Sequence, residues 1–239
     1  MLANKAIIGI VGKHYNSEKQ RTDTYIRDEV KQAIFDNGAI AIGILASNEE
    51  LIYCRDNWNE FGDILRKDDI INQINLCDGI ILQGGTTNEV FEFFIAKYCY
   101  DNDIPCLGIC AGQNCIVDAL GGTIKHVEKP ECHNRRKEIY AHDIQIIDKD
   151  SKFYSTVQTD SMQVNSRHKN VVDKHPLLDV VALDCDGNIE VVESKGKKFY
   201  MGVRYHPESL YKIDQKHNAI FQSFIDSCKN RKREYHGSL

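Results

Sequence analysis

Hydrophobic positions in the first half of the chain follow two alternating patterns. Short continuous apolar runs predict buried strands, and between them apolar residues recur at the three-to-four-residue spacing of a helix face. The strand-like runs are Ala6–Val11, Ala39–Leu45, Asp78–Gln83 and Ile104–Ile109, and the helical stretches cover about 25–37, 64–74 and 88–100. Asn37-Gly38 is a typical helix end. Strands that alternate with helices in this way are typical of a mostly parallel sheet.

Beyond Gly121-Gly122 the apolar runs become shorter and are separated by turn residues, as in antiparallel strands. Asp186-Gly187 predicts a two-residue hairpin turn between 180–185 and 188–193. Phe199–Arg204 then predicts a strand, and an apolar stripe from Ala219 to Ile225 predicts a closing helix. No linker is evident. We therefore expect a single α/β domain over 1–239, a three-layer sandwich around a central mostly parallel sheet.

Composition narrows the possible classes of function. Hydrophobic residues make up 42% of the 239 residues and charged residues 27%, as in ordinary soluble proteins. A net charge of -5 does not favour nucleic-acid binding, which needs clustered basic residues. The one basic run, Lys229–Arg233, is interpreted as a solvated helix end. The N-terminal run Ile7–Val11 is too short for a signal sequence or membrane span, which predicts a cytoplasmic protein without a membrane partner. Nine cysteines, an odd number without signs of secretion, are expected to be reduced.

The stretch CLGICAGQNC, residues 106–115, raises the question of a metal cluster or a reactive thiol. Its cysteines are four and five residues apart, with no histidine pair nearby, which is not zinc-site spacing. A looser set, His126, Cys132, His133 and His142, is interpreted as part of a polar loop. From spacing we therefore expect no bound metal.

The local pattern around Cys110 is G-x-C-x-G, at the junction of a predicted strand and a predicted helix. Its serine counterpart, the nucleophile elbow, needs small neighbours because the turn is tight and strained. Gly108, Ala111 and Gly112 meet that need. The positive end of the following helix favours the thiolate. We therefore expect Cys110 to be a reactive thiol, whereas Cys106 on the strand and Cys115 in the helix pack as small apolar residues.

A cysteine nucleophile needs a base and a group that orients the base. His206 and Glu208 lie two apart after the predicted strand 199–204, and residues two apart in extended chain project to the same side. His206 could thus face Cys110 while Glu208 holds its other ring nitrogen. An isolated His-Pro-Glu tripeptide is weak evidence, but together with the elbow it predicts a Cys-His-Glu triad.

Five motifs in series, GICAGQN, ALGGTI, VNSRH, DGNIEVVE and GVRYHPES, resemble the class I glutamine amidotransferase superfamily. Within it, the chain is most similar to the peptidase C26-like branch of γ-glutamyl hydrolases and γ-glutamyl-γ-aminobutyrate hydrolases. The resemblance implies a flavodoxin-like fold and the triad Cys110, His206 and Glu208. It also implies an oxyanion hole formed by the amides of Gly85 and Ala111. Substrate-binding residues carried over in the same way are Gly84, Gln113, Asn165, Ser166 and His168, although Asn165–His168 could equally be a polar turn.

The implied activity is cysteine-dependent hydrolysis of a γ-glutamyl amide through a thioester on Cys110, with no metal or organic cofactor. The partner would be a small γ-glutamyl substrate, and further possibilities are a homo-oligomer or a separate synthetase subunit. Ala111 replaces the family's usual arginine, Gln83 its proline, and VNSRHKN and GVRYHPE also depart from the branch pattern. A preference for γ-aminobutyrate as leaving amine is therefore not carried over. A glutaminase subunit that supplies ammonia to a synthetase and a non-catalytic relative remain alternatives.

Overall fold

The computed structural model describes residues 5–16, 22–46, 66–85, 89–127, 133, 135 and 137–236. Five parallel strands form the centre of its main sheet. Their spatial order is β4 (Ile40–Ile44), β1 (Ile7–Val11), β5 (Gly79–Leu82), β6 (Cys106–Ile109) and β13 (Tyr200–Val203). Ile81 faces one hydrophobic core, whereas Ile80 and Leu82 face the other. Burial on both faces explains the continuous apolar runs.

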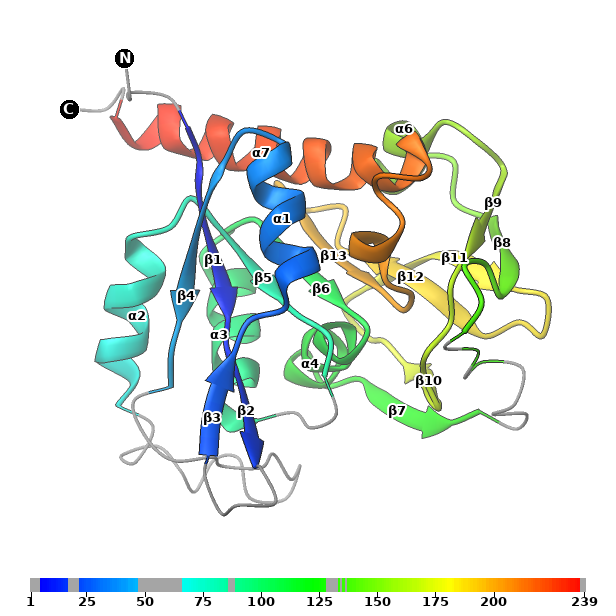
Figure 1. Ribbon diagram of the computed structural model, residues 1–239, viewed down its shortest axis with the longest axis horizontal. Coiled ribbons are helices and arrows are strands. Elements are labelled where there is room, and N and C mark those ends of the chain that lie inside the picture. The colour runs from blue at the N-terminus through cyan, green and yellow to red at the C-terminus, as the bar shows by residue number, and fades with distance from the viewer. Residues whose placement is uncertain are drawn as a thin grey trace.

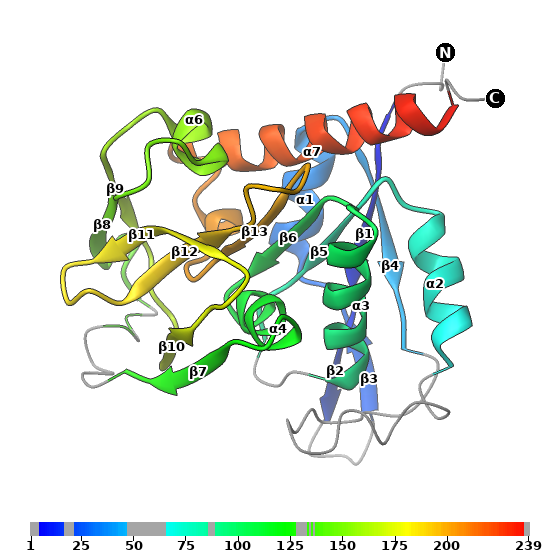
Figure 2. The ribbon, with the colours of Figure 1, turned by 180° about the vertical axis from the view of Figure 1, so that it is seen from behind.

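Helices cover both faces of this sheet, as Figures 1 and 2 show from opposite sides. The helices of one face are α1 (Asp28–Asp36), α6 (Lys152–Val157) and the long α7 (Gln215–His236). The helices of the other face are α2 (Lys67–Asn75), α3 (Val90–Asp101) and α4 (Ala111–Ala119). The predicted α/β class with a mostly parallel central sheet is confirmed. None of the helices described is long and apolar enough to cross a bilayer.

An antiparallel region continues the sheet from β13. It contains β12 (Ile189–Glu193), β11 (Asp179–Asp184), β8 (His142–Ile146) and β9 (Ser161–Val164) in that spatial order. A side branch is formed by β10 (Asn170–Lys174), which pairs with both β12 and β7 (Thr123–His126). A separate ribbon of β2 (Lys13–Asn16) and β3 (Thr22–Tyr25) completes the strands described.

Most predicted strands and helices occur where expected, within two or three residues at their ends, although Ile64, Leu65 and Asn88 lie outside the described residues. The closing helix α7 is longer at both ends than the predicted stripe from Ala219 to Ile225. The hairpin between β11 and β12 differs from the prediction. Its strands end at Asp184 and restart at Ile189, and the Asn188 carbonyl accepts a hydrogen bond from the Asp184 amide at 3.0 Å. Gly187 has φ +80°, so the turn is a longer one with a left-handed glycine. The polar ribbon β2–β3 was not predicted because it has no apolar periodicity.

Candidate active site

The predicted catalytic residues follow the carboxyl ends of three neighbouring parallel strands. Gly84 and Gly85 come after β5, Cys110 after β6 and His206 after β13. β6 pairs with β5 on one side and with β13 on the other. Loops at one edge of a parallel sheet converge, and such edges commonly hold active sites. The fold therefore brings together segments that are up to about 120 residues apart in the sequence.

The backbone at Cys110 has the strained geometry that the elbow motif predicts. Its φ of 52° and ψ of -101° are rarely adopted by residues other than glycine, and α4 begins at the next residue. A Cβ atom at Gly108 would lie 2.6 Å from the carbonyl oxygen of Gly112, and one at Gly112 would lie 2.0 Å from that of Leu82. Both glycines are therefore required by close approach of the backbone, which fixes α4 against β5 and β6.

His206 lies between Cys110 and Glu208. Its Nδ1 is 2.6 Å from Oε1 of Glu208, and its ring also shares a hydrogen bond with the Cys110 side chain. Both His206 and Glu208 are buried, whereas Cys110 is partly accessible. A Cβ atom at Gly84 would lie 2.8 Å from Cε1 of His206, so only glycine leaves this approach open. The three predicted catalytic side chains thus form one contiguous chain of contacts.

The charges of this group favour a thiolate and an imidazolium. Burial alone would raise the pKa of Cys110, but the charge and hydrogen bond of His206 outweigh it and lower that pKa. Burial would lower the pKa of His206, but Glu208 and Cys110 raise it to about 10. The pairing therefore shifts the sulfur toward the nucleophilic thiolate and keeps a protonated imidazole beside it.

The other two cysteines of the CLGICAGQNC stretch lie where expected, Cys106 in β6 and Cys115 in α4. Both are fully buried, and burial raises the pKa of each thiol well above its ordinary value. The seven cysteines in the described part of the chain are all free thiols. Cys110 is the one among these three whose pKa is lowered, as expected of a reactive thiol, and its role as the nucleophile stays a prediction.

Sequence reasoning did not identify Arg204 as part of the site. This buried arginine follows β13 and donates from Nη1 to Oδ1 of Asn114 at 2.7 Å and to the Cys110 carbonyl at 3.4 Å. Its charge also lowers the pKa of Cys110. Arg204 therefore ties β13 to the first turn of α4. An arginine immediately after a buried strand was the only available signal.

A buried ion pair supports the loop that contains Gly85. Nζ of Lys13 is 2.7 Å from Oε1 of Glu92, which lies in the first turn of α3. A Cβ atom at Gly85 would lie 2.3 Å from Cδ of Lys13, so the lysine stem packs directly against this glycine. The preceding Gln83, where the family has proline, donates from Nε2 to the carbonyls of Val11 and Tyr25. These two hydrogen bonds fix the backbone at Gln83 to the ends of β1 and β3, where a proline ring would have restricted it in the family.

The predicted substrate-binding residues divide into two groups. Gly84 faces the His206 ring, as described above. The other four side chains are buried and face neighbouring protein groups, and their part in substrate binding stays a prediction. Gln113 donates from Nε2 to the carbonyls of Glu190 and Gly202, both at 3.1 Å. The sequence could not show this, because each partner lies at least 77 residues away.

The VNSRH segment contacts the backbone of His206. Oδ1 of Asn165 accepts from the His206 amide at 2.9 Å, and its Nδ2 donates to the His206 carbonyl at 2.8 Å. Ser166 donates to the carbonyl of His133, and His168 lies in a cluster of histidines described below. These contacts assign Asn165 a positioning role for His206 and make Ser166 part of the framework.

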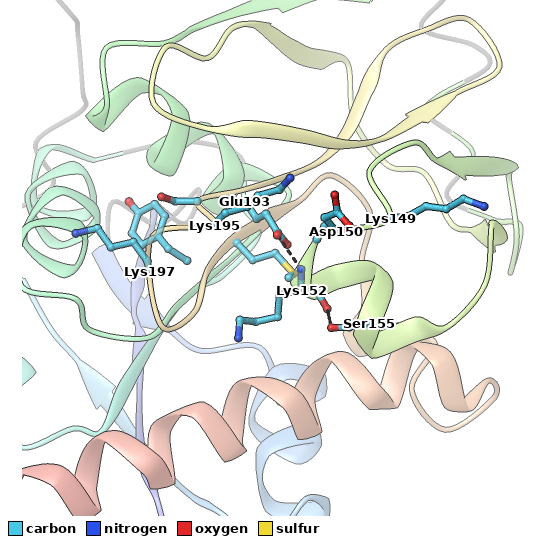
Figure 3. Close-up of a pocket in the computed structure, with 11 residues that line it drawn as sticks. Lys149, Asp150, Lys152, Ser155, Glu193, Lys195 and Lys197 are labelled. Atoms are coloured by element: carbon cyan, nitrogen blue, oxygen red, sulfur yellow. Dashed lines mark hydrogen bonds between the residues drawn. The ribbon is translucent and has the colours of Figure 1, made fainter.

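A separate cavity of about 290 Å³ lies between α6 and the β12–β13 turn (Figure 3). Lysines line it, but the Glu193 carboxylate already accepts from the amides of Lys152 and Phe153 at the start of α6. Lys195 is paired with Asp148 at 2.6 Å. The cavity contains none of the predicted catalytic residues.

Comparison with known proteins agrees with this geometry. A model of the peptidase C26 family matches residues 86–208. The chain belongs to the peptidase C26 family. That match contains Cys110 and ends at Glu208, so it spans all three members of the proposed triad. The predicted superfamily is confirmed, whereas the γ-glutamyl hydrolase branch within it stays a prediction.

Curated relatives include subunits and domains of synthases. The chain is 31% identical over 155 residues to the glutamine-hydrolyzing GMP synthase subunit of Methanothermobacter thermautotrophicus, covering 64% of this chain and 76% of that protein. It is 26% identical over 191 residues to CTP synthase of Chlamydia muridarum, covering 66% of this chain but only 35% of that protein. The chain thus spans about a third of the length of the CTP synthases that it matches.

Solved structures share the fold of the chain. The glutaminase domain of Trypanosoma brucei CTPS superimposes with a TM-score of 0.65 at 16% identity, covering 95% of this chain and 94% of that one. A GMP synthase subunit from Thermoplasma acidophilum superimposes with a TM-score of 0.63, also at 16% identity, covering 97% and 98%. At this identity the similarity establishes the glutamine amidotransferase fold.

Proposed function

We propose that the chain hydrolyses the γ-glutamyl amide bond of glutamine or of a γ-glutamyl amine through a thioester on Cys110. The observation that carries the proposal is the hydrogen-bonded series Cys110–His206–Glu208, placed on a strained turn at the carboxyl edge of the sheet. Membership of the peptidase C26 family supports the same reaction class.

The thiolate of Cys110 attacks the γ-carbonyl carbon, and the C=O electron pair moves onto the oxygen. The amides of Gly85 and Ala111 are proposed to stabilise this oxyanion; in a comparable site one such donor contributes about 2.7–4 kcal/mol. Collapse of the tetrahedral intermediate breaks the C–N bond, and the His206 imidazolium protonates the leaving amine. Neutral His206 then takes a proton from water, which attacks the thioester and releases glutamate and the free Cys110 thiol.

A second candidate is a glutaminase subunit that delivers ammonia to a separate synthetase. Its support is the similarity to the GMP synthase subunit of Methanothermobacter, of which this chain covers 76%. The two candidates share the chemistry at Cys110 and differ in what becomes of the nitrogen. A hydrolase acts alone and accepts substituted amines, whereas a subunit of this kind is expected to use glutamine and to be slow without its partner.

The test is glutamate release by the purified chain with glutamine, γ-glutamyl amines and γ-glutamyl peptides. Hydroxylamine should divert the thioester to γ-glutamyl hydroxamate. Cys110→Ala should abolish both products while remaining folded, because a small side chain suits the tight elbow. Cys106→Ala and Cys115→Ala are matched controls that should retain activity.

The pattern of turnover separates the candidates. Fast, Cys110-dependent turnover of a substituted γ-glutamyl amine supports the stand-alone hydrolase, and slow turnover restricted to glutamine supports the ammonia-delivering candidate. Equal activity of wild type and Cys110→Ala would refute both. Loss of activity in folded Cys115→Ala would show that a different thiol is the nucleophile.

A further inference from the structure

Four potential metal ligands meet in the antiparallel part of the sheet. His133 lies between β7 and β8, His142 begins β8, His168 lies between β9 and β10, and Glu190 belongs to β12. One ligand atom from each lies within 4.8 Å of all the others. The ring centroid of His133 is 5.1 Å from that of His168 and 5.5 Å from that of His142. Chain topology therefore gathers ligands that the spacing along the sequence does not reveal.

The side chains of this cluster face one another but do not form hydrogen bonds with one another. Oε1 of Glu190 is 3.4 Å from Nε2 of His168 and 3.8 Å from Nε2 of His142. Within the part of the chain that the structure describes, neither carboxylate oxygen of Glu190 nor Nε2 of any of the three histidines has a hydrogen-bond partner. Glu190, His168 and His133 are 0%, 4% and 2% exposed. Buried polar atoms normally have partners, so this group is incomplete as it stands.

The surrounding charges do not complete the group. Arg204 is the nearby cation, but its hydrogen bonds go to Asn114 and to the Cys110 carbonyl. Oδ2 of Asp184 lies 3.6 Å from Nε2 of His133 and adds a second negative charge beside the cluster. A carboxylate next to a ligating histidine is a common outer partner in metal sites, where it orients the ring. Two carboxylates with three imidazoles suit a divalent cation.

We propose that His133, His142, His168 and Glu190 bind one divalent transition-metal ion, preferentially Zn²⁺, in a closed structural site. Zinc bonds of about 2.0–2.1 Å in a tetrahedron place the ligand atoms about 3.4 Å apart, close to the shorter separations described above. Three nitrogens and one oxygen are a suitable donor set for zinc, and four protein ligands leave no open position. The expectation of no metal rested on sequence spacing, which does not apply to ligands from four segments.

The proposed ion would join the segments behind the catalytic histidine. His168 lies three residues after Asn165, which holds the backbone of His206 on both sides. The backbone carbonyl of Glu190 accepts from the amide of Arg204 and from Gln113 in α4. The metal would therefore fix the framework under the site and take no part in bond cleavage. The proposal does not depend on the proposed hydrolase activity, because binding is measured directly.

The first experiment measures zinc by inductively coupled plasma mass spectrometry in the full chain, purified with its affinity tag removed. One equivalent per chain is expected. Chelator should remove it and lower the melting temperature, and added Zn²⁺ should restore both. Co²⁺ added to the metal-free protein should give the visible d–d bands of a tetrahedral site. His168→Ala and Glu190→Gln should each weaken Co²⁺ binding. The loss should exceed the about 10–100-fold that is typical when a residue hydrogen-bonded to a metal ligand is removed. His126→Ala, at an exposed position of β7, is the matched control and should bind like wild type.

Two results would overturn the proposal. One is a wild-type protein that holds no zinc and shows no change in melting temperature on addition of Zn²⁺. The other is Co²⁺ binding that is unchanged in His168→Ala and Glu190→Gln. If those variants do not fold, X-ray absorption on the wild-type Zn²⁺ or Co²⁺ protein decides: a shell of nitrogen and oxygen supports the site, whereas sulfur ligands would place the ion on cysteines and refute it.

Discussion

Asn165 provides the sharpest test of how the structure holds His206, the proposed catalytic base. Replacing it with alanine removes both hydrogen bonds to the His206 backbone, at 2.8 and 2.9 Å. The buried His206 amide is then left without a partner, whereas its carbonyl keeps the Ser209 amide at 3.2 Å. Asn165 is 1% exposed, so water has little access to replace it. The unsatisfied buried amide costs about 1–3 kcal/mol and the lost hydrogen bond to the carbonyl about 1 kcal/mol, which together predict a loss of about 2–4 kcal/mol in the free energy of unfolding.

For a domain of this size, 1 kcal/mol lowers the melting temperature by about 2–4 °C, so Asn165→Ala should melt about 5–15 °C below wild type. The measurement is thermal unfolding followed by circular dichroism, confirmed by urea denaturation. Gln163→Ala is the matched control, because its side chain is exposed on β9, the strand that ends just before Asn165, and it should stay within about 0.5 kcal/mol of wild type.

The same variant distinguishes positioning from substrate binding. If Asn165 acts through His206, kcat for glutamate release should fall on the order of 10–100-fold with KM nearly unchanged, because a displaced base misaligns proton transfer. A residue that contacts substrate would instead raise KM without lowering stability. A melting temperature equal to wild type together with a raised KM would refute the positioning role.

Two further predictions concern charge and packing. The pH profile of kcat/KM should rise as Cys110 ionises below its ordinary pKa and fall near pH 10 as His206 loses its proton. Glu208→Gln removes the charge that raises the pKa of His206, so the falling limb of the profile should move to lower pH. A falling limb that stays in place would contradict the pairing of His206 with Glu208. Gly112→Ala places a methyl group 2.0 Å from the Leu82 carbonyl oxygen and should lower the free energy of unfolding by about 3 kcal/mol or more, measured by urea denaturation. Gly196→Ala, which has open space around it, is the control and should be nearly neutral. Equal stability of the two variants would show that α4 can shift away from β5.

Local patterns along the chain were sufficient for much of the architecture. The runs at 6–11, 78–83 and 104–109 became β1, β5 and β6, because a strand buried on both faces needs continuous apolar residues. The elbow at Cys110 could also be predicted, because the close backbone approaches that require Gly108 and Gly112 leave a recognisable pattern within five residues of sequence. Ribbon β2–β3 escaped prediction because four polar residues carry no periodic signal.

The candidate site was predicted only in part. Cys110 and the His206–Glu208 pair have signatures in sequence because each lies on one short segment with recognisable turn chemistry. Arg204 and the buried pair Lys13–Glu92 have none, because their partners come from other strands and helices. Gln113 and Asn165 were recognised as important, but the direction of their side chains depended on elements far away in the chain.

The cluster of His133, His142, His168 and Glu190 could not be predicted from the sequence alone. The sequence by itself determines that His133, His142, His168 and Glu190 are present, and among them it predicts a strand position only for Glu190. Only the antiparallel pairing of the second half decides that four segments spread over 58 residues converge within 4.8 Å and away from solvent. Amphipathic periodicity and tight turns are local properties that leave a trace in every short window. Convergence of distant side chains is set by strand order and register, which no short window contains.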